Sequence, residues 1–308
     1  MSKKIAIIIP VYNEVSNLTL MLNAIKKVLS PLPYLYNVIF VDDGSDDDSL
    51  QFIKQLAITN SEVNYISFSR NFGHQNALKA GFDMSSADAV ISMDGDMQHP
   101  PEVIPTLLAL WEQGNDIVYT IRKDHREMPM MKRKTSDLFY NILNRLSSIE
   151  LEKGTADFRL LDKKVVDVLR EIKEYDLFWR GLVKWLGFKQ ISIEYTPAER
   201  ATGKSKYTYK KMMEFALRGI TSFSTKPLTI AIYLGFVSAL ISVLYVPYAL
   251  IGHYYGYSTS GWASVIVTIA FFGGVQLMIL GIIGMYLGKL FMQSKQRPHY
   301  IINESKLT

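Results

Sequence analysis

Two aspartates separated by one glycine are the strongest chemical signal in the sequence. Asp94 and Asp96 follow a short apolar run at residues 89–93, and Gln98 comes two residues later. Paired carboxylates at a strand end can hold a hard divalent cation against a diphosphate, and Gln98 could add a neutral oxygen ligand. An Asp-x-Asp sequence alone is also common in solvated turns and at helix starts, so the metal hypothesis depends on the surrounding motifs.

Two further polar clusters follow apolar runs in the same way. Tyr12 and Glu14 come after residues 5–9, and Asp43 comes after residues 38–41. Tyr12 offers an aromatic face to a nucleobase, and a carboxylate can accept hydrogen bonds from base N–H groups or ribose hydroxyls. Simple packing of Tyr12, and a turn that Asp43 forms with Gly44, are the alternative interpretations.

The elements that must position these residues are short strands separated by helices. Buried parallel strands are predicted for five apolar runs, at residues 5–9, 38–41, 63–68, 89–93 and 117–121. Apolar residues from Leu18 to Leu29 recur at helical spacing, Pro31 ends that helix, and Pro100 with Pro101 should begin another. Strands that alternate with helices predict an α/β fold with a mostly parallel sheet, in which ligands bind at the carboxyl ends of the strands.

Four ordered motifs point to a known family. They are IIIPVYNE, FVDDGSDDDS, SFSRNFGHQNALKAGF and SMDGDMQHPPEVI. Together they resemble the signature of family-2 GT-A glycosyltransferases, and more narrowly the polyprenyl-phosphate branch with dolichol-phosphate mannose synthases and bactoprenol-phosphate glucosyltransferases. The resemblance spans roughly residues 5 to 210 and continues into the carboxyl-terminal segment. It implies a Rossmann-like GT-A catalytic domain over residues 1–206.

The resemblance implies roles for individual residues. The residues that it implies for nucleotide binding are Pro10, Tyr12, Glu14, Asp43 and Asp94. The residues that it implies for metal binding are Asp94, Asp96 and Gln98, with Mg²⁺ or Mn²⁺ as the cofactor. Asp96 would act in catalysis through that metal, whereas His74 and His99 receive no role.

Asp157, in the segment GTADFRLLD, matches a family carboxylate beside the acceptor that is often described as a catalytic base. A phosphate acceptor has a second pKa of about 6 and is already anionic near neutral pH, so a base is not obligatory. Asp157 could instead orient a sugar hydroxyl or a cationic residue, or it could cap a loop.

Two basic segments resemble phosphate-binding parts of the family. The acceptor-phosphate residues that the resemblance implies are Arg122, Lys132, Arg133 and Ser136. A mobile segment that would close on the diphosphate is implied for Arg200, Lys204 and Lys206. Electrostatic docking to the membrane is an alternative for the first group, and a solvated basic linker is an alternative for the second.

The distribution of charge predicts a membrane anchor. The net charge is +5, yet no Asp, Glu, Lys or Arg occurs between Lys226 and Lys289. Residues 227–251 and 262–288 are each long enough to span a bilayer, and an amphipathic interfacial helix is predicted just before them at residues 207–226. Basic residues flank the two spans, so the positive-inside rule predicts cytoplasmic termini and a cytoplasmic tail at residues 289–308. A buried soluble hairpin is the alternative.

Composition narrows the remaining possibilities. The chain has no cysteine, which excludes disulfides and thiolate metal sites. The apolar run at residues 5–9 is too short for a signal peptide. Basic residues surround the apolar spans, which favours a membrane partner over nucleic acid.

The resemblance implies an inverting hexosyltransferase. Its donor would be a nucleotide-sugar, with UDP-glucose as the best choice, and its acceptor a polyprenyl phosphate such as undecaprenyl phosphate at the cytoplasmic membrane face. A homo-oligomer is possible. The rival hypotheses are a processive polysaccharide synthase, disfavoured because no Gln-x-x-Arg-Trp motif is present, and a non-catalytic membrane scaffold.

Overall fold

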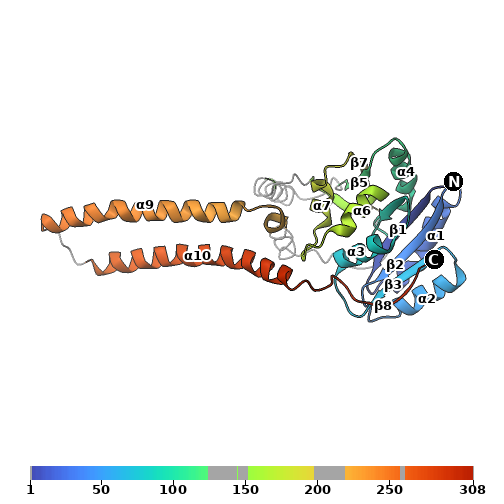
Figure 1. Ribbon diagram of the computed structural model, residues 1–308, viewed down its shortest axis with the longest axis horizontal. Helices are drawn as coiled ribbons and strands as arrows, with labels where there is room; N and C mark the ends of the chain where they lie inside the picture. The colour runs from blue at the N-terminus through green and yellow to red at the C-terminus, as the bar shows by residue number, and fades with distance from the viewer. Residues whose placement is uncertain (1, 124–143, 145–151, 198–218, 257–260, 308) are drawn as a thin grey trace.

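The protein consists of an α/β domain from which two long helices extend (Figure 1). The computed structural model describes residues 2–123, 144, 152–197, 219–256 and 261–307. Within these residues one sheet has the strand order β7-β5-β6-β4-β1-β2-β3-β8. The strands are β1 (Lys4–Val11), β2 (Leu35–Asp42), β3 (Val63–Phe68), β4 (Ala89–Ser92), β5 (Ile117–Arg122), β6 (Thr155–Asp162), β7 (Gln190–Tyr195) and β8 (Ile302–Lys306).

The five predicted strands form the first five strands of the sheet. β1, β2, β3 and β4 pair in parallel, and the register of β1 and β2 brings Val11 opposite Asp42. The segments that follow these strands therefore meet at one edge of the sheet, as the α/β interpretation predicts. The prediction of a mostly parallel α/β sheet is confirmed.

Three further strands complete the sheet: β7 pairs in parallel with β5, whereas β6 and β8 run antiparallel to their neighbours. β6 lies between β4 and β5, and Ser92 is paired with Arg159. Because β6 runs opposite to β4, its first residues lie beside the last residues of β4. This pairing brings Asp157 to the same edge of the sheet as the segment that contains Asp94.

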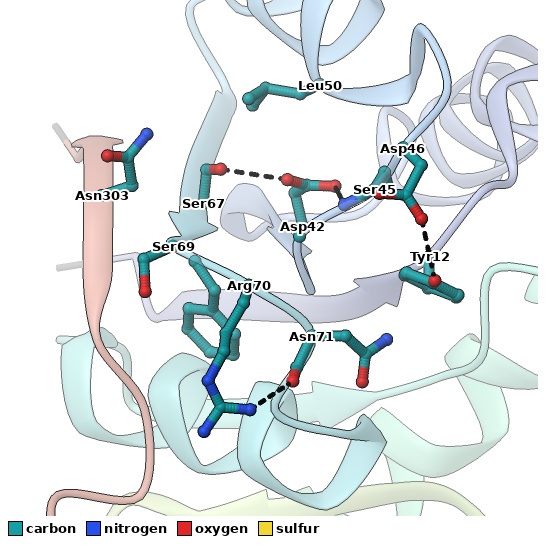
Figure 2. Close-up of a pocket in the computed structure, with 12 residues that line it drawn as sticks. Tyr12, Asp42, Ser45, Asp46, Leu50, Ser67, Ser69, Arg70, Asn71 and Asn303 are labelled. Carbon is teal, nitrogen blue, oxygen red and sulfur yellow. Dashed lines mark hydrogen bonds between the residues drawn. The ribbon is translucent and has the colours of Figure 1, made fainter.

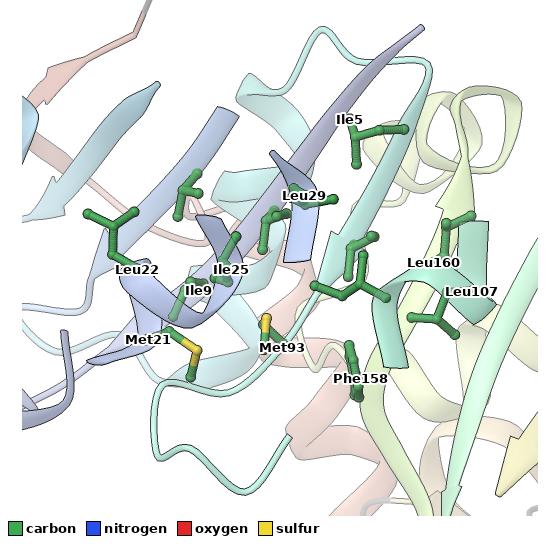
Figure 3. Close-up of a cluster of buried hydrophobic side chains, with 14 of the residues drawn as sticks. Ile5, Ile9, Met21, Leu22, Ile25, Leu29, Met93, Leu107, Phe158 and Leu160 are labelled. Carbon is green, nitrogen blue, oxygen red and sulfur yellow. The ribbon is translucent and has the colours of Figure 1, made fainter. Parts of the chain in front are cut away.

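Helices cover both faces of the sheet. They are α1 (Val15–Leu29), α2 (Ser49–Thr59), α3 (His74–Met84), η1 (Pro101–Val103), α4 (Ile104–Glu112), α6 (Lys163–Glu171) and α7 (Trp179–Trp185). Side chains alternate along β1, so Ile7 and Ile9 pack against α1, α2 and α4, whereas Ile8 packs against α3, α6 and α7. Figure 3 shows the first cluster. Each fully buried Leu or Ile contributes roughly 1.5–3 kcal/mol relative to an exposed one.

The two remaining helices are α9 (Lys226–Tyr254) and α10 (Trp262–Ser294). Among the described residues, these two are long and apolar enough to cross a membrane, with mean hydropathies of 2.1 and 2.4. Their apolar side chains are mostly exposed, and the helices lie side by side away from the sheet (Figure 1). They are therefore compatible with membrane association. Most of the predicted interfacial helix at residues 207–226 lies outside the described residues.

The segment after the predicted second span differs from a simple tail. The helix continues to Ser294, and its last turns contact the α/β domain. Lys289 Nζ lies 3.0 Å from Asp176 Oδ2, and Gln293 Nε2 donates to Lys173 O at 2.8 Å. The chain then returns to the sheet, where β8 pairs antiparallel with β3. Nothing local in the sequence indicates this strand, because its pairing joins residues far apart in the chain.

Candidate active site

A pocket of about 330 Å³ opens at the carboxyl ends of β2 and β3 (Figure 2). Its lining comes from the segments after β1, β2 and β3, from the start of α2 and from β8. The lining residues are Tyr12, Asp42, Gly44, Ser45, Asp46, Leu50, Ser67, Phe68, Ser69, Arg70, Asn71 and Asn303. Among the predicted nucleotide-binding residues, Tyr12 is the one that lines this pocket, and its hydroxyl donates to Asp46 Oδ2 at 3.2 Å.

Two backbone positions hold the pocket loops together. Asn13 has a φ of 57°, its side-chain oxygen accepts from the Asp46 N–H at 2.9 Å, and its own N–H donates to Ser45 Oγ. Gly44 has a φ of +66°, and a Cβ there would lie 2.4 Å from the backbone carbon of Arg70. Only glycine combines this left-handed conformation with such close approach of the neighbouring loop.

Asp42 and Asp43 have different environments. Asp42 lines the pocket, and its Oδ2 accepts from the Ser67 hydroxyl at 3.0 Å. Asp43 is buried, and its carboxylate accepts from the backbone N–H groups of Phe72 and Gly73. Burial raises the pKa of Asp43, although these two hydrogen bonds oppose the change. Asp42 therefore lies in the pocket lining, whereas Asp43 stabilises the loop between β3 and α3.

Pro10 and Glu14 also lie apart from the pocket lining. Pro10 is buried within β1, and its carbonyl oxygen would lie 3.3 Å from a Cβ built on Gly95. The Glu14 carboxylate accepts from Asn17 Nδ2 at 2.6 Å. Pro10 thus lies against the Asp94–Asp96 loop, whereas Glu14 contacts the first turn of α1.

Two histidines contact Asp94. His74 Nε2 lies 2.8 Å from Asp94 Oδ1, and His99 Nδ1 accepts from the Asp94 N–H at 2.9 Å. Burial would raise the pKa of Asp94, but the two histidines and the charge of Arg180 hold it well below its usual range. Burial would lower the pKa of His74, yet the adjacent Asp94 carboxylate raises it above the ordinary value. Asp94 therefore remains a carboxylate near neutral pH.

The other two predicted metal ligands lie in the same loop. The Gln98 N–H donates to Asp96 Oδ1 at 3.1 Å, and Arg122 Nη1 donates to Gln98 Oε1 at 3.4 Å. Over the described part of the chain, no three His, Asp or Glu side chains cluster into a protein-only metal site. Two carboxylates and an amide oxygen suit Mg²⁺ or Mn²⁺, because such ions usually complete their coordination with substrate phosphates and water.

Asp157 lies in a buried cluster with two arginines. Its side chain is 8% exposed, and its carboxylate lies 2.8 Å from Arg159 Nη2 and 3.0 Å from Arg180 Nη2. Burial alone would raise the pKa of Asp157, but the two guanidinium groups outweigh burial and lower it. The charge of Arg180 also lowers the pKa of Asp94, which places this cluster next to the Asp94–Asp96 loop.

Sequence reasoning missed several residues of this site. Residues two apart on a strand share one face, so the position of Arg159 relative to Asp157 was a usable signal. Arg180 is distant from Asp157 in the chain, and His74 is distant from Asp94. Only the fold brings each pair together. The remaining predicted phosphate-binding residues lie outside the described residues: Lys132, Arg133, Ser136, Arg200, Lys204 and Lys206.

Comparisons with known proteins agree with this geometry. The model of the family "Glycosyl transferase family 2" matches residues 6–170. The "Uncharacterized glycosyltransferase YkcC" of Bacillus subtilis is 39% identical over 301 residues, covering 97% of this chain and 93% of the relative. The "Bactoprenol glucosyl transferase" of Shigella phage SfV is 40% identical over 304 residues, covering 98% of this chain and 99% of the relative.

A solved structure shares the fold. The mannosyltransferase PcManGT from Pyrobaculum calidifontis, in complex with GDP-Man and Mn²⁺, aligns with a TM-score of 0.50 and 12% identity over 96% of this chain and 87% of that chain. The polar edge of the sheet, the family match and the full-length relatives lead to one conclusion. The chain belongs to glycosyl transferase family 2 and is a glycosyltransferase with a GT-A fold.

Proposed function

We propose that this enzyme transfers a sugar from a nucleotide-sugar to a polyprenyl phosphate in the membrane. The best choice is glucose from UDP-glucose and undecaprenyl phosphate as the acceptor. The observation that carries this proposal is the 40% identity to a bactoprenol glucosyl transferase over 98% of the chain, because that alignment includes both apolar helices. The pocket, the paired aspartates and the apolar helices support the same assignment.

The donor would lie along the carboxyl edge of the sheet. Its nucleoside would occupy the pocket that Tyr12 and Asp42 line, and its diphosphate would extend toward Asp94. Asp94 and Asp96, with Gln98, would hold Mg²⁺ or Mn²⁺. The bound ion would supply charge neutralisation for the diphosphate that leaves. The low pKa of Asp94 supports this role, since it keeps the carboxylate ionised.

The transfer would be a single displacement with inversion. A phosphate oxygen of the lipid attacks the anomeric carbon as the bond from that carbon to the diphosphate oxygen breaks, and the electron pair leaves with the nucleoside diphosphate. No proton has to be removed from an acceptor that is already a dianion, because its second pKa is about 6. Positioning and charge stabilisation therefore account for the rate.

Asp157 would act as a positioning residue in this scheme. A carboxylate that two arginines hold ionised is a weak base, so the pairing with Arg159 and Arg180 favours an orienting role over proton abstraction. Asp157 would hold the Arg180 guanidinium where its positive charge faces the phosphates. Arg122, which contacts Gln98, would contribute to binding of the acceptor phosphate.

The membrane arrangement follows from the same proposal. α9 and α10 would cross the bilayer with both termini and the catalytic domain in the cytoplasm, where nucleotide-sugars are made. The contacts of Lys289 with Asp176 and Ser222 support an active site close to the membrane surface, because they join the end of α10 to the catalytic domain.

A donor and acceptor screen tests the proposal. Purified full-length protein would be incubated with radiolabelled UDP- or GDP-sugars, a divalent cation and a short polyprenyl phosphate, and lipid-linked label measured after organic extraction. We expect transfer from UDP-glucose that depends on the polyprenyl phosphate, and a product of inverted anomeric configuration by NMR. Label that appears only with GDP-sugars would refute the donor assignment, and label in a polymer would refute the acceptor assignment.

A further inference from the structure

The carboxyl-terminal strand forms part of the pocket wall. Asn303 of β8 lines the pocket together with Ser67 and Ser69 of the segment that begins in β3. Figure 2 shows Asn303 on the side of the pocket opposite Tyr12, with Asp42 and Ser67 between them. The chain reaches this position only after the two membrane helices, so the site includes a segment outside the 6–170 family match.

An irregularity in the strand pairing places Asn303 there. Ser67 pairs with Glu304 but Phe68 pairs with Ile302, so Asn303 is the extra residue of a β-bulge on β8. A bulge changes the direction in which a side chain points and is common next to functional sites. Asn303 is exposed, and within the described residues no hydrogen bond to the protein involves its side-chain amide.

Contacts on both sides of the bulge hold the strand in place. Before it, Tyr300 stacks on Phe68 at 5.1 Å and its hydroxyl donates to Asp83 Oδ2 at 2.8 Å. After it, Lys54 Nζ lies 2.6 Å from Glu304 Oε1. Asn303 is therefore presented from an anchored strand, which keeps its amide ready for a ligand.

The order of the strands indicates which part of a nucleotide would meet Asn303. Asp94 follows β4, and β8 lies at the edge of the sheet beyond β1, β2 and β3. A donor whose diphosphate lies at Asp94 would extend its base toward β8. An asparagine amide offers a donor and an acceptor side by side, which matches the edge of a uracil or guanine base.

We infer that the Asn303 side chain hydrogen-bonds the edge of the donor nucleobase and contributes to base specificity. This inference rests on the proposed use of a nucleotide-sugar. An uncharged asparagine can serve both the N–H and the carbonyl of uracil, whereas an aspartate could serve only the N–H. Asn303→Asp should therefore penalise uracil more than guanine, because guanine presents additional N–H groups on its edge.

The test measures binding of free UDP and GDP to the full-length protein by calorimetry. We expect Asn303→Ala to weaken UDP binding by about three- to tenfold, the effect of one lost hydrogen bond. The KM for the nucleotide-sugar should rise by the same factor with kcat unchanged. Asn303→Asp should shift the ratio of UDP to GDP affinity toward GDP. The melting temperature should not change, because Asn303 is exposed.

Ser305 provides the matched control on the same strand. It is exposed and lies outside the pocket lining, so Ser305→Ala and Ser305→Asp should leave both affinities unchanged. Wild-type affinities in both Asn303 variants, or an equal shift in Ser305→Asp, would overturn the inference and leave the proposed function intact. Wild-type protein that binds neither nucleotide would overturn the proposed function itself, and the inference with it.

Discussion

Replacement of Asp157 by asparagine removes the counter-charge of a buried arginine. The Arg159 side chain is 3% exposed, and its Nη2 lies 2.8 Å from Asp157 Oδ1. A guanidinium group stays charged in proteins, so Arg159 would become a buried cation without an anion at its side. Removal of one partner of a buried ion pair costs about 3–5 kcal/mol.

The structure favours the lower end of this range. Arg159 also donates to the carbonyl oxygens of Ala156 at 3.0 Å and Trp179 at 3.5 Å, and the asparagine oxygen could still accept one hydrogen bond. We therefore expect a loss of about 3 kcal/mol in the free energy of unfolding. That loss is a large part of the 5–15 kcal/mol typical of a folded domain.

The effect should depend on pH. Burial opposes the charged form of Asp157, but Arg180 and Arg159 lower its folded-state pKa below the ordinary value for an aspartate. A carboxyl group whose pKa is lower in the folded state stabilises the fold at pH values above its unfolded-state pKa of about 3.9. This contribution is lost as the pH falls through the folded-state pKa. The difference in stability between wild type and Asp157→Asn should be constant near neutral pH and should shrink below about pH 4.

Denaturant unfolding in detergent, followed by tryptophan fluorescence, would measure the free energy, and hydrogen exchange of β6 would localise it. Asp167→Asn is the control, because it breaks an Asp–Arg pair in the same domain whose carboxylate is 47% exposed. An exposed pair is worth about 0–1 kcal/mol. A loss for Asp157→Asn as small as that of the control would refute the reasoning, as would a difference that persists unchanged at low pH.

Three further predictions address the metal, the acceptor and the topology. Asp96→Asn should fold normally but lose activity by orders of magnitude, and EDTA should abolish wild-type activity until Mg²⁺ or Mn²⁺ is restored; full activity in EDTA would contradict the metal assignment. Arg133→Lys should reduce transfer in detergent almost as much as Arg133→Ala, because lysine lacks the bidentate fork, and a normal rate for either variant would leave only a membrane-docking role. A cysteine at Ser260 should react with an impermeant maleimide on intact cells and a cysteine at Ser294 should not; the reverse labelling would overturn the proposed orientation.

Local patterns in the sequence were sufficient to predict the first five parallel strands of the sheet. The apolar runs that became β1 to β5 are buried on both faces, and such runs stand out without knowledge of their partners. The Asp94–Asp96 motif and Tyr12 were identified for the same reason, since each follows directly after one of these runs. The uncharged stretch between Lys226 and Lys289 predicted the two apolar helices by length alone.

The sequence could not show which of Asp42 and Asp43 lines the pocket and which is buried against the neighbouring loop. Adjacent residues at a strand end point in opposite directions, and which of them enters the pocket depends on the loop packed beside it. Here the Phe72 and Gly73 N–H groups hold Asp43 within the protein and leave Asp42 to line the pocket. The motif alone is compatible with either arrangement.

The amino-acid sequence by itself therefore determined the fold class and the family, and it predicted the segments proposed to carry the chemistry, because these depend on residues close together in the chain. Tertiary structure decided the partners: Arg180 beside Asp157, His74 beside Asp94, and Asn303 at the pocket formed by β2 and β3. Each of these pairings closes a loop of many residues. Loop closure costs conformational entropy, and the packing of the whole sheet offsets this cost. A local sequence pattern therefore cannot reveal which distant residues will pair.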